Sequence, residues 1–543
     1  MTSPADEPQA PTGRTFRGPL HMIGNAHIDA TWLWPWQEGY QEARATFSSA
    51  LDRIAEYDGF AFSCDSVAYL AWIEEHDPEL FARLQAEVAA GRFEIVGGWW
   101  VEPDCNIPSG ESFARHGLYS QRYLVEKFGR PATIGCNVDP FGQNATIPQL
   151  LAKAGMSSYV FMRPQAHEKA MPAQTFRWHA ADGSTVLTYR IPHEYCSPAG
   201  HLDLHVRRAL AQLPHTEAPL MCFYGVGNHG GGPTKDNIES ILALDGKNQF
   251  PRMRFSTIAD FFAAVRDRDD TPDFTGEIQP HAVGCYSVHS GIKQWLRQTE
   301  NALQAAEKWS TVASVLDGSP ALTGEFERGW RQVLLNHFHD TAAGTALPSA
   351  YEDARDQLGE ARAIAARAQN RAVQSITRRI AIAEQDGTAP LVVLNPHPWP
   401  VTATAEVEFG GALGEGDYVA ETAGGIAPVQ QVRSTTTTGG RRRLLVPVSM
   451  PALGYRLYRL RRATTTAPVP ASGDELTLEN AHLRVTIDPA NGFVSSLLDK
   501  ESGIDVMRGA SGAHAVVLDD PSDTWGHGVV GYSDVIGSFR PTS

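Results

Sequence analysis

The chain is organised around the stretch Leu20-His-Met-Ile-Gly-Asn-Ala-His-Ile-Asp-Ala-Thr-Trp-Leu-Trp-Pro-Trp36. It opens with an apolar-leaning run, after which His27 and Asp29 stand two residues apart. In a strand, residues two apart point to the same side, so this imidazole and this carboxylate can reach one point in space. Such a pair is half of a metal site, and the tryptophans beside it suit a ligand with flat apolar faces. The competing interpretation is a histidine hydrogen-bonded in a core, beside tryptophans that only pack.

The surrounding chain, from about residue 20 to 270, alternates short apolar runs with helical periodicity. Leu80, Leu84 and Val88 form one helical stripe, and Gly91 ends it before a strand at 93–96. Further strands are predicted at 133–138, 158–162, 219–225 and 253–255, with Ser256 as a candidate N-cap of the next helix. This alternation is typical of a parallel α/β sheet, open or closed into a barrel. In both, ligands gather at the carboxyl ends of the strands.

After about residue 285 the pattern changes to long helices and then to strands. Helices are predicted at 291–316, 322–338 and 348–382, and their apolar stripes would be buried against one another. From Leu391 on, apolar strands alternate with Thr, Gly and Pro turns, which indicates part of a β-sandwich. The predicted divisions are a disordered lead at 1–17, a β/α domain at 18–284, a helical bundle domain at 285–385 and a β-sandwich region at 386–543. The last region lacks a clear closing element, so we expect it to be truncated.

Composition restricts the class of protein. The 543 residues are 42% hydrophobic and 20% charged, and they contain no apolar run long enough for a membrane span. The formal net charge of -16 repels phosphate backbones and anionic membranes, which argues against nucleic acid as a partner and favours a neutral substrate. The N-terminus shows no secretory signal, and the six cysteines are scattered without a CxxC pair. We therefore expect a cytoplasmic protein with reduced thiols.

Polar side chains gather where strands of the β/α domain are predicted to end. The loop at 97–111 follows one strand and holds two tryptophans with three carboxylates. Asp139 follows the strand that ends near Val138, and Pro140 and Gly142 turn the chain sharply there. Either segment alone is also compatible with an ordinary loop or turn.

Further candidates lie later in the chain. His337, His339 and Asp340 stand at the end of a predicted helix, where histidines can also cap carbonyls. The glycine-rich stretch 225–234 lacks the Gly-Lys-Ser/Thr ending of a phosphate loop, so we interpret it as a flexible rim loop. A metal site needs about four nitrogen or oxygen ligands. The pair at 27 and 29, the carboxylate at 139 and a histidine near 339 would supply them from three separated segments.

Five pieces of this sequence, in order over about 320 residues, resemble one enzyme family. They are His27-Ile-Asp29 with Trp32, the Gly-Gly-Trp-Trp-Val-Glu-Pro-Asp loop, Asp139-Pro-Phe-Gly142, the rim residues His229-Gly-Gly-Gly232, and His339-Asp340 with Gly344-Thr345. Together they resemble the glycoside hydrolase family 38 α-mannosidases. The similarity extends into the β region, where the segment 491–500 resembles the start of the family's large β domain.

The resemblance implies a seven-stranded β/α barrel as the catalytic domain at 18–284, followed by a three-helix bundle and β-sandwich domains. It also implies one zinc ion per chain. The matching zinc ligands are His27, Asp29, Asp139 and His339. Asp139 further matches the nucleophile of a retaining mechanism, in which it forms a covalent glycosyl-enzyme.

The resemblance also extends to the sugar pocket. Trp32 and Phe141 match residues that line it, and Arg163 and Asp340 match polar groups around it. The acid/base residue has no clean match, and Glu277 and His281 are both candidates for that role.

The implied reaction is hydrolysis of terminal α-mannosides, with an oligosaccharide or a small mannoside as substrate. A homo-oligomer is compatible with the sequence. Family members are often several hundred residues longer, so one alternative is an inactive, truncated carbohydrate-binding protein. Another is a metal-dependent polysaccharide deacetylase, since His/Asp zinc sites also occur on incomplete β/α barrels. Release of acetate instead of mannose would select the deacetylase.

Overall fold

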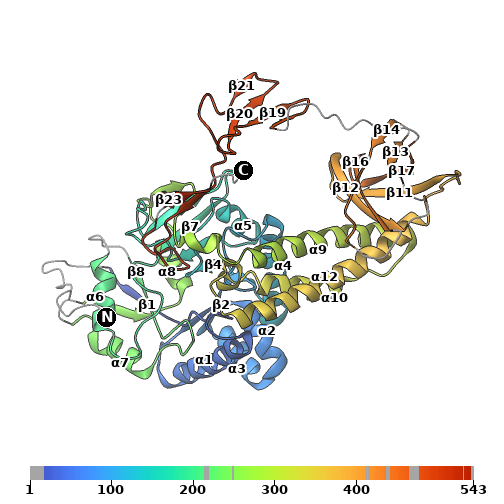
Figure 1. Cartoon of the computed structure of the whole chain (residues 1–543). Helices are drawn as coiled ribbons and strands as arrows, with labels where there is room; N and C mark the ends of the chain where they lie inside the picture. The colour runs from blue at the N-terminus through green and yellow to red at the C-terminus, as the bar shows by residue number, and fades with distance from the viewer. Residues whose placement is uncertain are drawn as a thin grey trace. The chain divides into compact units, whose positions relative to one another are not determined.

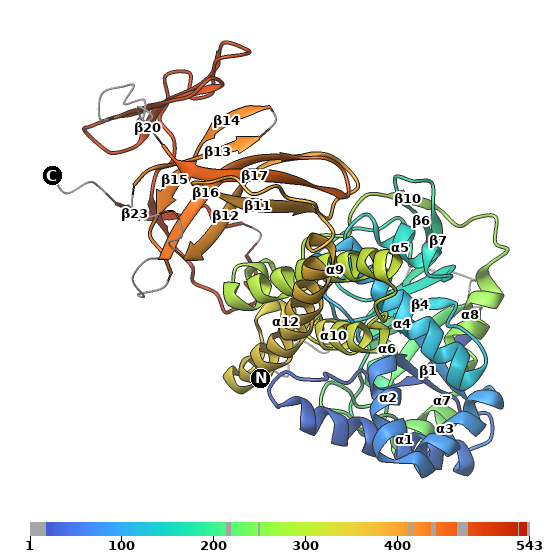
Figure 2. The same cartoon turned by 90° about the vertical axis from the view of Figure 1, so that its right-hand side faces the viewer.

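The computed structural model describes residues 18–212, 219–247, 250–410, 413, 416–422, 424–435, 441–463, 476–529 and 531–539. The disordered lead predicted at 1–17 lies outside the described residues. Strands alternate with helices in the first half, long helices follow, and antiparallel strands come last (Figure 1, Figure 2). This order confirms a mixed α/β fold.

The stretch that opens the described chain forms an inner strand of a parallel sheet. β1 (Leu20–Asn25) pairs with β2 (Phe62–Ser66), β8 (Leu220–Tyr224) and β9 (Met253–Phe255), and β3 (Phe93–Trp99) extends β2. Every residue of β1 is buried, which explains why its run does not alternate with exposed polar residues. The residues that follow β1 therefore leave the sheet at the edge where ligands gather.

A second sheet has the strand order β10-β6-β7-β5-β4. Its strands are β4 (Ile134–Asn137), β5 (Ser158–Phe161), β6 (Thr175–His179), β7 (Thr185–Arg190) and β10 (Asp273–Thr275). β6 and β7 form an antiparallel hairpin, whereas the other pairings are parallel. One hydrophobic cluster contains Ile23, Val160 and Phe223, so the two sheets share a core. The described pairings form two sheets without a ladder between them, so a closed seven-stranded barrel stays a prediction.

The helices between these strands begin and end for local reasons. The Asp77 side chain caps α3 (Pro78–Ala89), and Ser109 caps α4 (Gly110–Phe128), which ends at a left-handed Gly129. Thr257, not the predicted Ser256, caps α8 (Ile258–Val265), because the Ser256 hydroxyl instead bonds a buried histidine ring. The remaining helices of this part are α1 (Trp36–Glu56), α2 (Val67–His76), α5 (Ile147–Lys153), α6 (Asp203–Ala211) and α7 (Lys235–Leu244).

Long helices follow where the sequence predicts them. They are α9 (Ser290–Asp317), α10 (Thr323–Leu335) and α12 (Pro348–Thr377), with the short α11 (His339–Ala343) between the last two. A Cβ added at Gly329 of α10 would lie 3.1 Å from the Leu303 side chain and 3.8 Å from the Ala361 backbone. The glycine therefore lets α9, α10 and α12 approach closely at this point. A separate bundle domain stays a prediction.

The chain forms two compact units. The first contains Met1–Gln304, Leu322–Arg367 and Ser522–Val530, and the second contains Ala305–Ala321, Ala368–Pro521 and Gly531–Ser543. A short segment from far along the chain thus packs with the first unit. The four divisions predicted from the sequence stay a prediction.

The β-rich part of the second unit is antiparallel. One sheet has the order β11-β17-β13-β14 and another the order β12-β16-β15, and a single apolar cluster takes residues from both, as in a sandwich. These strands are β11 (Thr388–Asn395), β12 (Val401–Gly410), β13 (Tyr418–Thr422), β14 (Gly425–Pro428), β15 (Gln430–Val432), β16 (Arg441–Met450) and β17 (Gly454–Arg462). Shorter strands from β18 (Thr477–Glu479) to β23 (Val535–Ser538) form two small sheets.

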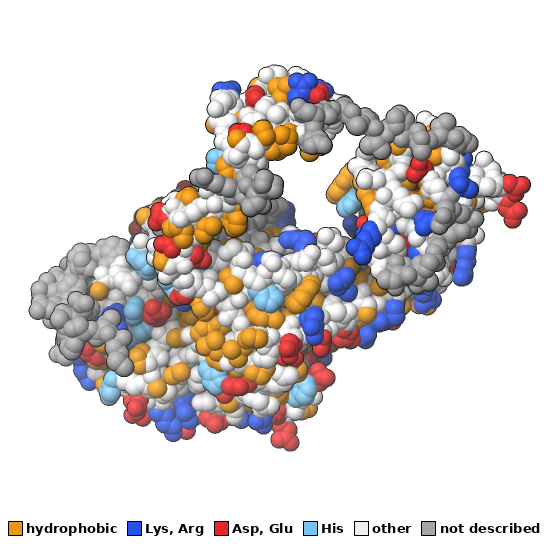
Figure 3. All heavy atoms as spheres, viewed as in Figure 1, with side chains coloured by type: hydrophobic (Ala, Val, Ile, Leu, Met, Phe, Trp, Pro, Cys, Tyr) orange, Lys and Arg blue, Asp and Glu red, His pale blue; other side chains and the backbone are white. Residues whose placement is uncertain are grey.

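Surface charge follows the composition. Acidic and basic side chains are interspersed along the lower edge of the face drawn in Figure 3.

Among the described residues, no helix combines the length and the apolar character needed to cross a membrane.

Candidate metal centre

The first two candidate ligands lie on the segment that leaves β1. His27 and Asp29 are each 1% exposed. The backbone of this segment pairs with the glycine-rich rim loop, since Asn228 N donates to His27 O (2.6 Å) and Asp29 N donates to Asn228 O (2.8 Å). A Cβ at Gly227 would lie 3.0 Å from His27 O and 2.2 Å from Cys196 Sγ, so glycine favours this close approach. The rim loop therefore fixes the first ligand pair.

The other two candidates arrive from separate elements. Asp139 follows β4, where Gly142 adopts a positive φ of 98° that lets the chain turn back. His339 is the first residue of α11, is fully buried, and is followed by a left-handed Gly344 that ends this short helix. Three distant parts of the chain therefore meet at one place, as the sequence predicts.

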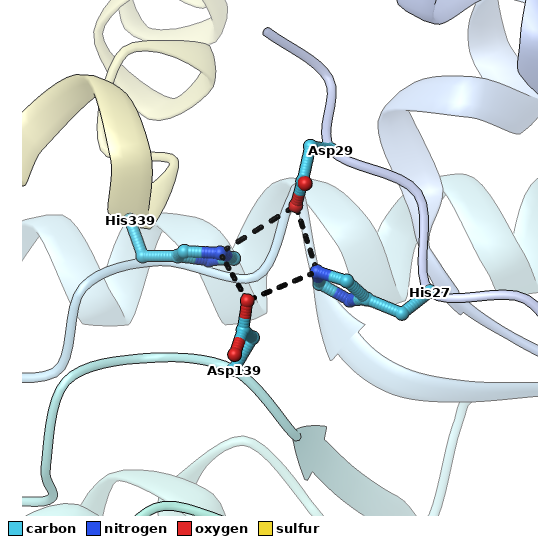
Figure 4. A group of neighbouring side chains, drawn as sticks. All are labelled: His27, Asp29, Asp139 and His339. Atoms are coloured by element: carbon cyan, nitrogen blue, oxygen red, sulfur yellow. Dashed lines mark hydrogen bonds and ion pairs between the residues drawn. The ribbon is translucent and has the colours of Figure 1, made fainter. Parts of the chain in front are cut away.

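His27, Asp29, Asp139 and His339 offer ligand atoms that all lie within 4.8 Å of one another (Figure 4). His27 Nε2 lies 2.8 Å from Asp29 Oδ1 and 3.8 Å from Asp139 Oδ2. His339 Nε2 lies 3.7 Å from each of the same two carboxylate oxygens. The two Nε2 atoms and two carboxylate oxygens thus face one another in a buried space.

The charges in this cluster depend strongly on one another. Burial would lower the pKa of His27, but the Glu102 and Asp29 carboxylates raise it well above its ordinary value. Burial also opposes protonation of His339, yet the Asp139 carboxylate 3.7 Å away and the Asp340 carboxylate raise the pKa to about 9. Burial alone would raise the pKa of Asp139, but the Arg163 guanidinium and the two imidazoles hold this pKa far below its ordinary value. The carboxylates therefore attract positive charge to the position that the imidazole nitrogens face.

These residues fit a zinc ion. Two imidazoles and two carboxylates are ligands that Zn²⁺ accepts, and a catalytic zinc ion can take a further oxygen ligand beside its protein ligands. His339 Nε2 is buried and makes no hydrogen bond, although a buried polar nitrogen normally has a partner. A divalent cation would satisfy this nitrogen and balance the carboxylates, in competition with protons for the same lone pairs.

Comparison with known proteins identifies the family. The glycosyl hydrolases family 38 N-terminal domain matches residues 18–280, and the alpha mannosidase middle domain matches residues 282–376. The chain belongs to glycoside hydrolase family 38. The family resemblance of the sequence is thereby confirmed.

Individual relatives of this family 38 chain are longer. It is 27% identical to alpha-mannosidase 2C1 of Mus musculus over 522 residues, covering 93% of this chain and 47% of the relative. It is 28% identical to alpha-mannosidase G of Dictyostelium discoideum over 536 residues, covering 93% and 48%. The chain therefore spans about half the length of the curated relatives it matches. A crystal structure of an alpha-mannosidase from Enterococcus faecalis V583 shares the fold, with a TM-score of 0.76, 18% identity, and coverage of 97% of this chain and 64% of that one.

The three tryptophans near the cluster differ in their surroundings. Trp34 is buried and donates from Nε1 to Asp29 O (3.0 Å), and Trp36 packs near Trp72 with 6.1 Å between ring centroids. Trp32 is only partly buried, and its Nε1 is covered yet makes no hydrogen bond. Of the three, Trp32 is therefore the one with a covered indole donor that lacks a hydrogen-bond partner.

The other predicted pocket residues surround the same cluster. Phe141 is buried with its ring edge-on to His339, at 5.7 Å between centroids. Arg163 Nε donates to Asp139 Oδ1. Asp340 Oδ2 lies 3.8 Å from His339 Nε2, and burial together with Asp29 raises the pKa of Asp340 to about 7. The structure thus brings these three residues into contact with the candidate metal ligands.

The two acid/base candidates are placed differently. His281 is 8% exposed, with Nδ1 2.6 Å from Glu168 Oε1 and Nε2 3.2 Å from Arg163 Nη1. Arg163 in turn holds Asp139, so His281 stands one residue away from the cluster. Glu277 is exposed, and no described contact joins it to these residues.

His337, the neighbouring candidate at the helix end, belongs to another network. Its Nε2 lies 3.1 Å from Glu300 Oε1, and its Nδ1 lies 3.3 Å from His116 Nε2. His337 therefore does not join the four candidate metal ligands, although it is only two residues from His339 in the sequence.

Sequence reasoning missed one aromatic residue at the site. Trp525 lies 6.5 Å from Trp32 between ring centroids, at 90°, and packs against a small cluster that includes Phe141. Gly284 N donates to Trp525 O at 3.1 Å. No spacing rule links Trp525 to Trp32, because they stand at opposite ends of the chain.

Proposed function

We propose that this chain is a zinc-dependent retaining α-mannosidase that hydrolyses terminal α-mannosides of an oligosaccharide or a small mannoside. The observation that carries the proposal is the buried group His27, Asp29, Asp139 and His339, built from three segments in a chain of glycoside hydrolase family 38. With it we propose the family's arrangement of a seven-stranded barrel, a helical bundle and a β-sandwich. The names of the curated relatives support the mannoside substrate.

The site residues divide the chemistry between them. We assign the two histidines and two aspartates as ligands of one zinc ion. A zinc ion held by them would supply Lewis-acid binding of sugar hydroxyls, which would favour a distorted ring. Arg163 keeps Asp139 ionised and oriented through its bond to Oδ1. Trp32 and Phe141 offer apolar faces to the ring, and Asp340 accepts hydrogen bonds from its hydroxyls.

The proposed reaction consists of two successive displacements at the anomeric carbon. A carboxylate oxygen of Asp139 bonds to the anomeric carbon while the bond from that carbon to the leaving oxygen breaks. The acid, His281 or Glu277, gives the leaving oxygen its proton. The same residue then takes a proton from water, which attacks the anomeric carbon and releases Asp139. Two inversions leave the anomeric configuration retained.

The proposal also covers the surroundings of the enzyme. We propose a cytoplasmic location and a homo-oligomer as a compatible assembly. The six cysteines are free thiols, which suits a reducing compartment.

The test combines activity with metal content. Purified chain should hydrolyse an aryl α-mannoside, contain one equivalent of zinc, and lose activity in a strong chelator. Asp139→Asn should lower kcat/KM on the order of 10⁴-fold or more, since losing a nucleophile is this costly in other covalent enzymes. A fluorinated mannosyl fluoride, whose glycosyl-enzyme is hydrolysed slowly, should label the peptide that contains Asp139. Mass spectrometry would detect the label.

Asp182→Asn is the matched control, because Asp182 is exposed in the turn between β6 and β7 and should leave activity unchanged. Full activity of Asp139→Asn would contradict the nucleophile assignment. Release of acetate from an acetylated polysaccharide, or mannose binding without turnover, would favour the two alternative functions instead.

A further inference from the structure

Glu102 lies directly behind the candidate metal ligands. It follows β3, is 1% exposed, and forms with His27 and Asp65 a second group of close ligand atoms that shares only His27 with the first. No sequence pattern singles it out among the three carboxylates of its loop. Its contacts with the candidate metal ligands distinguish Glu102 from the other two carboxylates, Asp104 and Glu111.

The carboxylate and the main-chain carbonyl of Glu102 each face one histidine. Glu102 Oε2 lies 3.4 Å from His27 Nδ1. Glu102 O lies 3.1 Å from His339 Nδ1 and also accepts the His339 N–H at 3.3 Å. With the proton on Nδ1, the His339 ring donates to Glu102 O, the His27 ring turns its Nδ1 towards the Glu102 carboxylate, and both rings keep the lone pair of Nε2 for the four candidate ligands. One residue thus selects the same tautomer in both histidines.

The same carboxylate also holds the backbone at the third ligand. Glu102 Oε1 accepts from Val138 N (2.9 Å), and Glu102 Oε2 is 3.4 Å from Asp139 N. These amides belong to the turn where the chain leaves β4 and directs the Asp139 side chain at the cluster. The neighbouring backbone reinforces this link, because Asp104 N donates to His337 O (2.9 Å) and Pro103 pairs with Phe338.

We propose that Glu102 is the positioning residue of the metal centre, which orients His27 and His339 as Nε2 ligands and fixes the turn that carries Asp139. The inference rests on the proposed function for the presence of a metal, but not on the identity of the substrate. Asp29 is the one ligand that Glu102 does not contact in the described structure. Partners that orient metal-bound histidines commonly change metal affinity by about 10–100-fold when removed.

Glu102→Gln is the informative substitution. Both carboxylate oxygens accept backbone hydrogen bonds, so an amide nitrogen must face either Val138 N–H or Asp139 N–H, donor against donor, and in the second case it also faces His27 Nδ1. We expect about 10–100-fold weaker binding of Zn²⁺, measured with the full chain by competition against a chelator without substrate. With Co²⁺ in place of zinc, the visible absorption bands should shift, because they report ligand geometry.

Glu94→Gln is the matched control. Glu94 is a partly buried carboxylate on β3 that likewise accepts backbone N–H groups, those of Ile258 and Ala259, but it has no described contact with the four candidate ligands. It should lose stability without changing zinc affinity or the cobalt spectrum. A purely structural role of Glu102 would make the two variants alike.

Glu102→Asp keeps the charge but withdraws it by one methylene, so it tests the role if Glu102→Gln does not fold. It too should bind zinc more weakly than the wild type. Zinc affinity and a cobalt spectrum equal to the wild type in Glu102→Asp or in folded Glu102→Gln would overturn the proposal. Wild-type zinc binding without mannoside hydrolysis would refute the proposed function and leave the role of Glu102 standing.

Discussion

Asp139 uses its two carboxylate oxygens for different partners. Oδ1 accepts from Arg163 Nε, whereas Oδ2 faces His27 Nε2 at 3.8 Å and His339 Nε2 at 3.7 Å. The arginine therefore fixes the rotation of the carboxylate, and Oδ2 is left to the metal cluster. A second catalytic group beside Asp139 must also lie close to Arg163. His281 meets this condition.

The acid role can be tested at His281. Because the His281 ring touches Arg163 and Glu168, while Glu277 is exposed, we expect His281→Gln to be the damaging variant. For an alkyl mannoside, whose leaving oxygen needs a proton, kcat/KM should fall about 10²–10⁴-fold, the usual contribution of general acid catalysis. A dinitrophenyl mannoside needs no such proton and should lose much less in its first step. Steady-state kinetics with both substrates measures the difference.

Glu277→Gln should leave both substrates close to wild type. If instead Glu277→Gln shows the leaving-group dependence and His281→Gln does not, Glu277 is the acid. Azide added to the correct variant should yield mannosyl azide, since an anion needs no base to attack the glycosyl-enzyme.

At the residue scale, spacing predicts part of the site. The i, i+2 relation identifies His27 and Asp29, and a strand end identifies Asp139. Residue type alone does not separate His337 from His339, since the choice depends on a Glu300 that lies on another helix. Glu102 could not be recognised either, because its function lies in contacts with three distant segments.

Helix α9 is joined to its neighbours by one buried carboxylate. Glu300 accepts from Ser109 N (3.0 Å) and the Ser112 hydroxyl (2.6 Å) at the start of α4, and from Arg297 on its own helix (2.6 Å). The oxygen that accepts from the two serines, Oε1, also lies 3.1 Å from Nε2 of His337, just before α11. Burial would raise the pKa of Glu300, but these donors, His337 foremost, lower it from 4.5 to about 2.

This lowered pKa predicts a pH-dependent stability. A depressed carboxyl pKa stabilises the fold above about pH 4.5, and the contribution disappears as the pH falls towards about 2. The shift corresponds to roughly 3 kcal/mol. Glu300→Gln should therefore be less stable than wild type at pH 6, and the difference should shrink between about pH 4.5 and 2. Denaturant unfolding at several pH values measures it.

Glu352→Gln on the exposed face of α12 is the control and should show no such pH dependence. A Glu300→Gln difference that stays constant from pH 6 to 2 would contradict the assignment to ionisation.

At the element scale, periodicity predicts the helices closely, because their apolar stripes are long. The hairpin β6–β7 was missed even though its turn contains Asp182-Gly183, a favoured hairpin pair between alternating residues. Strand order could not be predicted, since β1 pairs with strands that come much later in the sequence.

At the scale of the whole molecule, the first unit includes a segment, 522–530, that follows most of the second unit in sequence. This segment contributes Trp525, which stands against Trp32 at the site. Trp525 could not be linked to the site from the sequence, because the contact spans nearly the whole chain.

Removing this ring should weaken sugar binding. Trp525→Ala is expected to raise KM for an aryl α-mannoside roughly two- to tenfold, from ~0.5–1.5 kcal/mol of aromatic packing, with a smaller effect on kcat. Trp399→Ala, at an exposed tryptophan of the second unit, is the control. Equal KM values for the two variants would exclude Trp525 from the sugar site.

The position of Trp525 also determines the order in which the site is made on the ribosome. All four proposed metal ligands are synthesised by residue 339, whereas Trp525 follows close to 190 residues later, on the order of 10–40 s at typical elongation rates. The segments that carry the proposed ligands are therefore available to bind a metal ion first. Trp525 can join Trp32 only after the β-rich part of the chain has been synthesised.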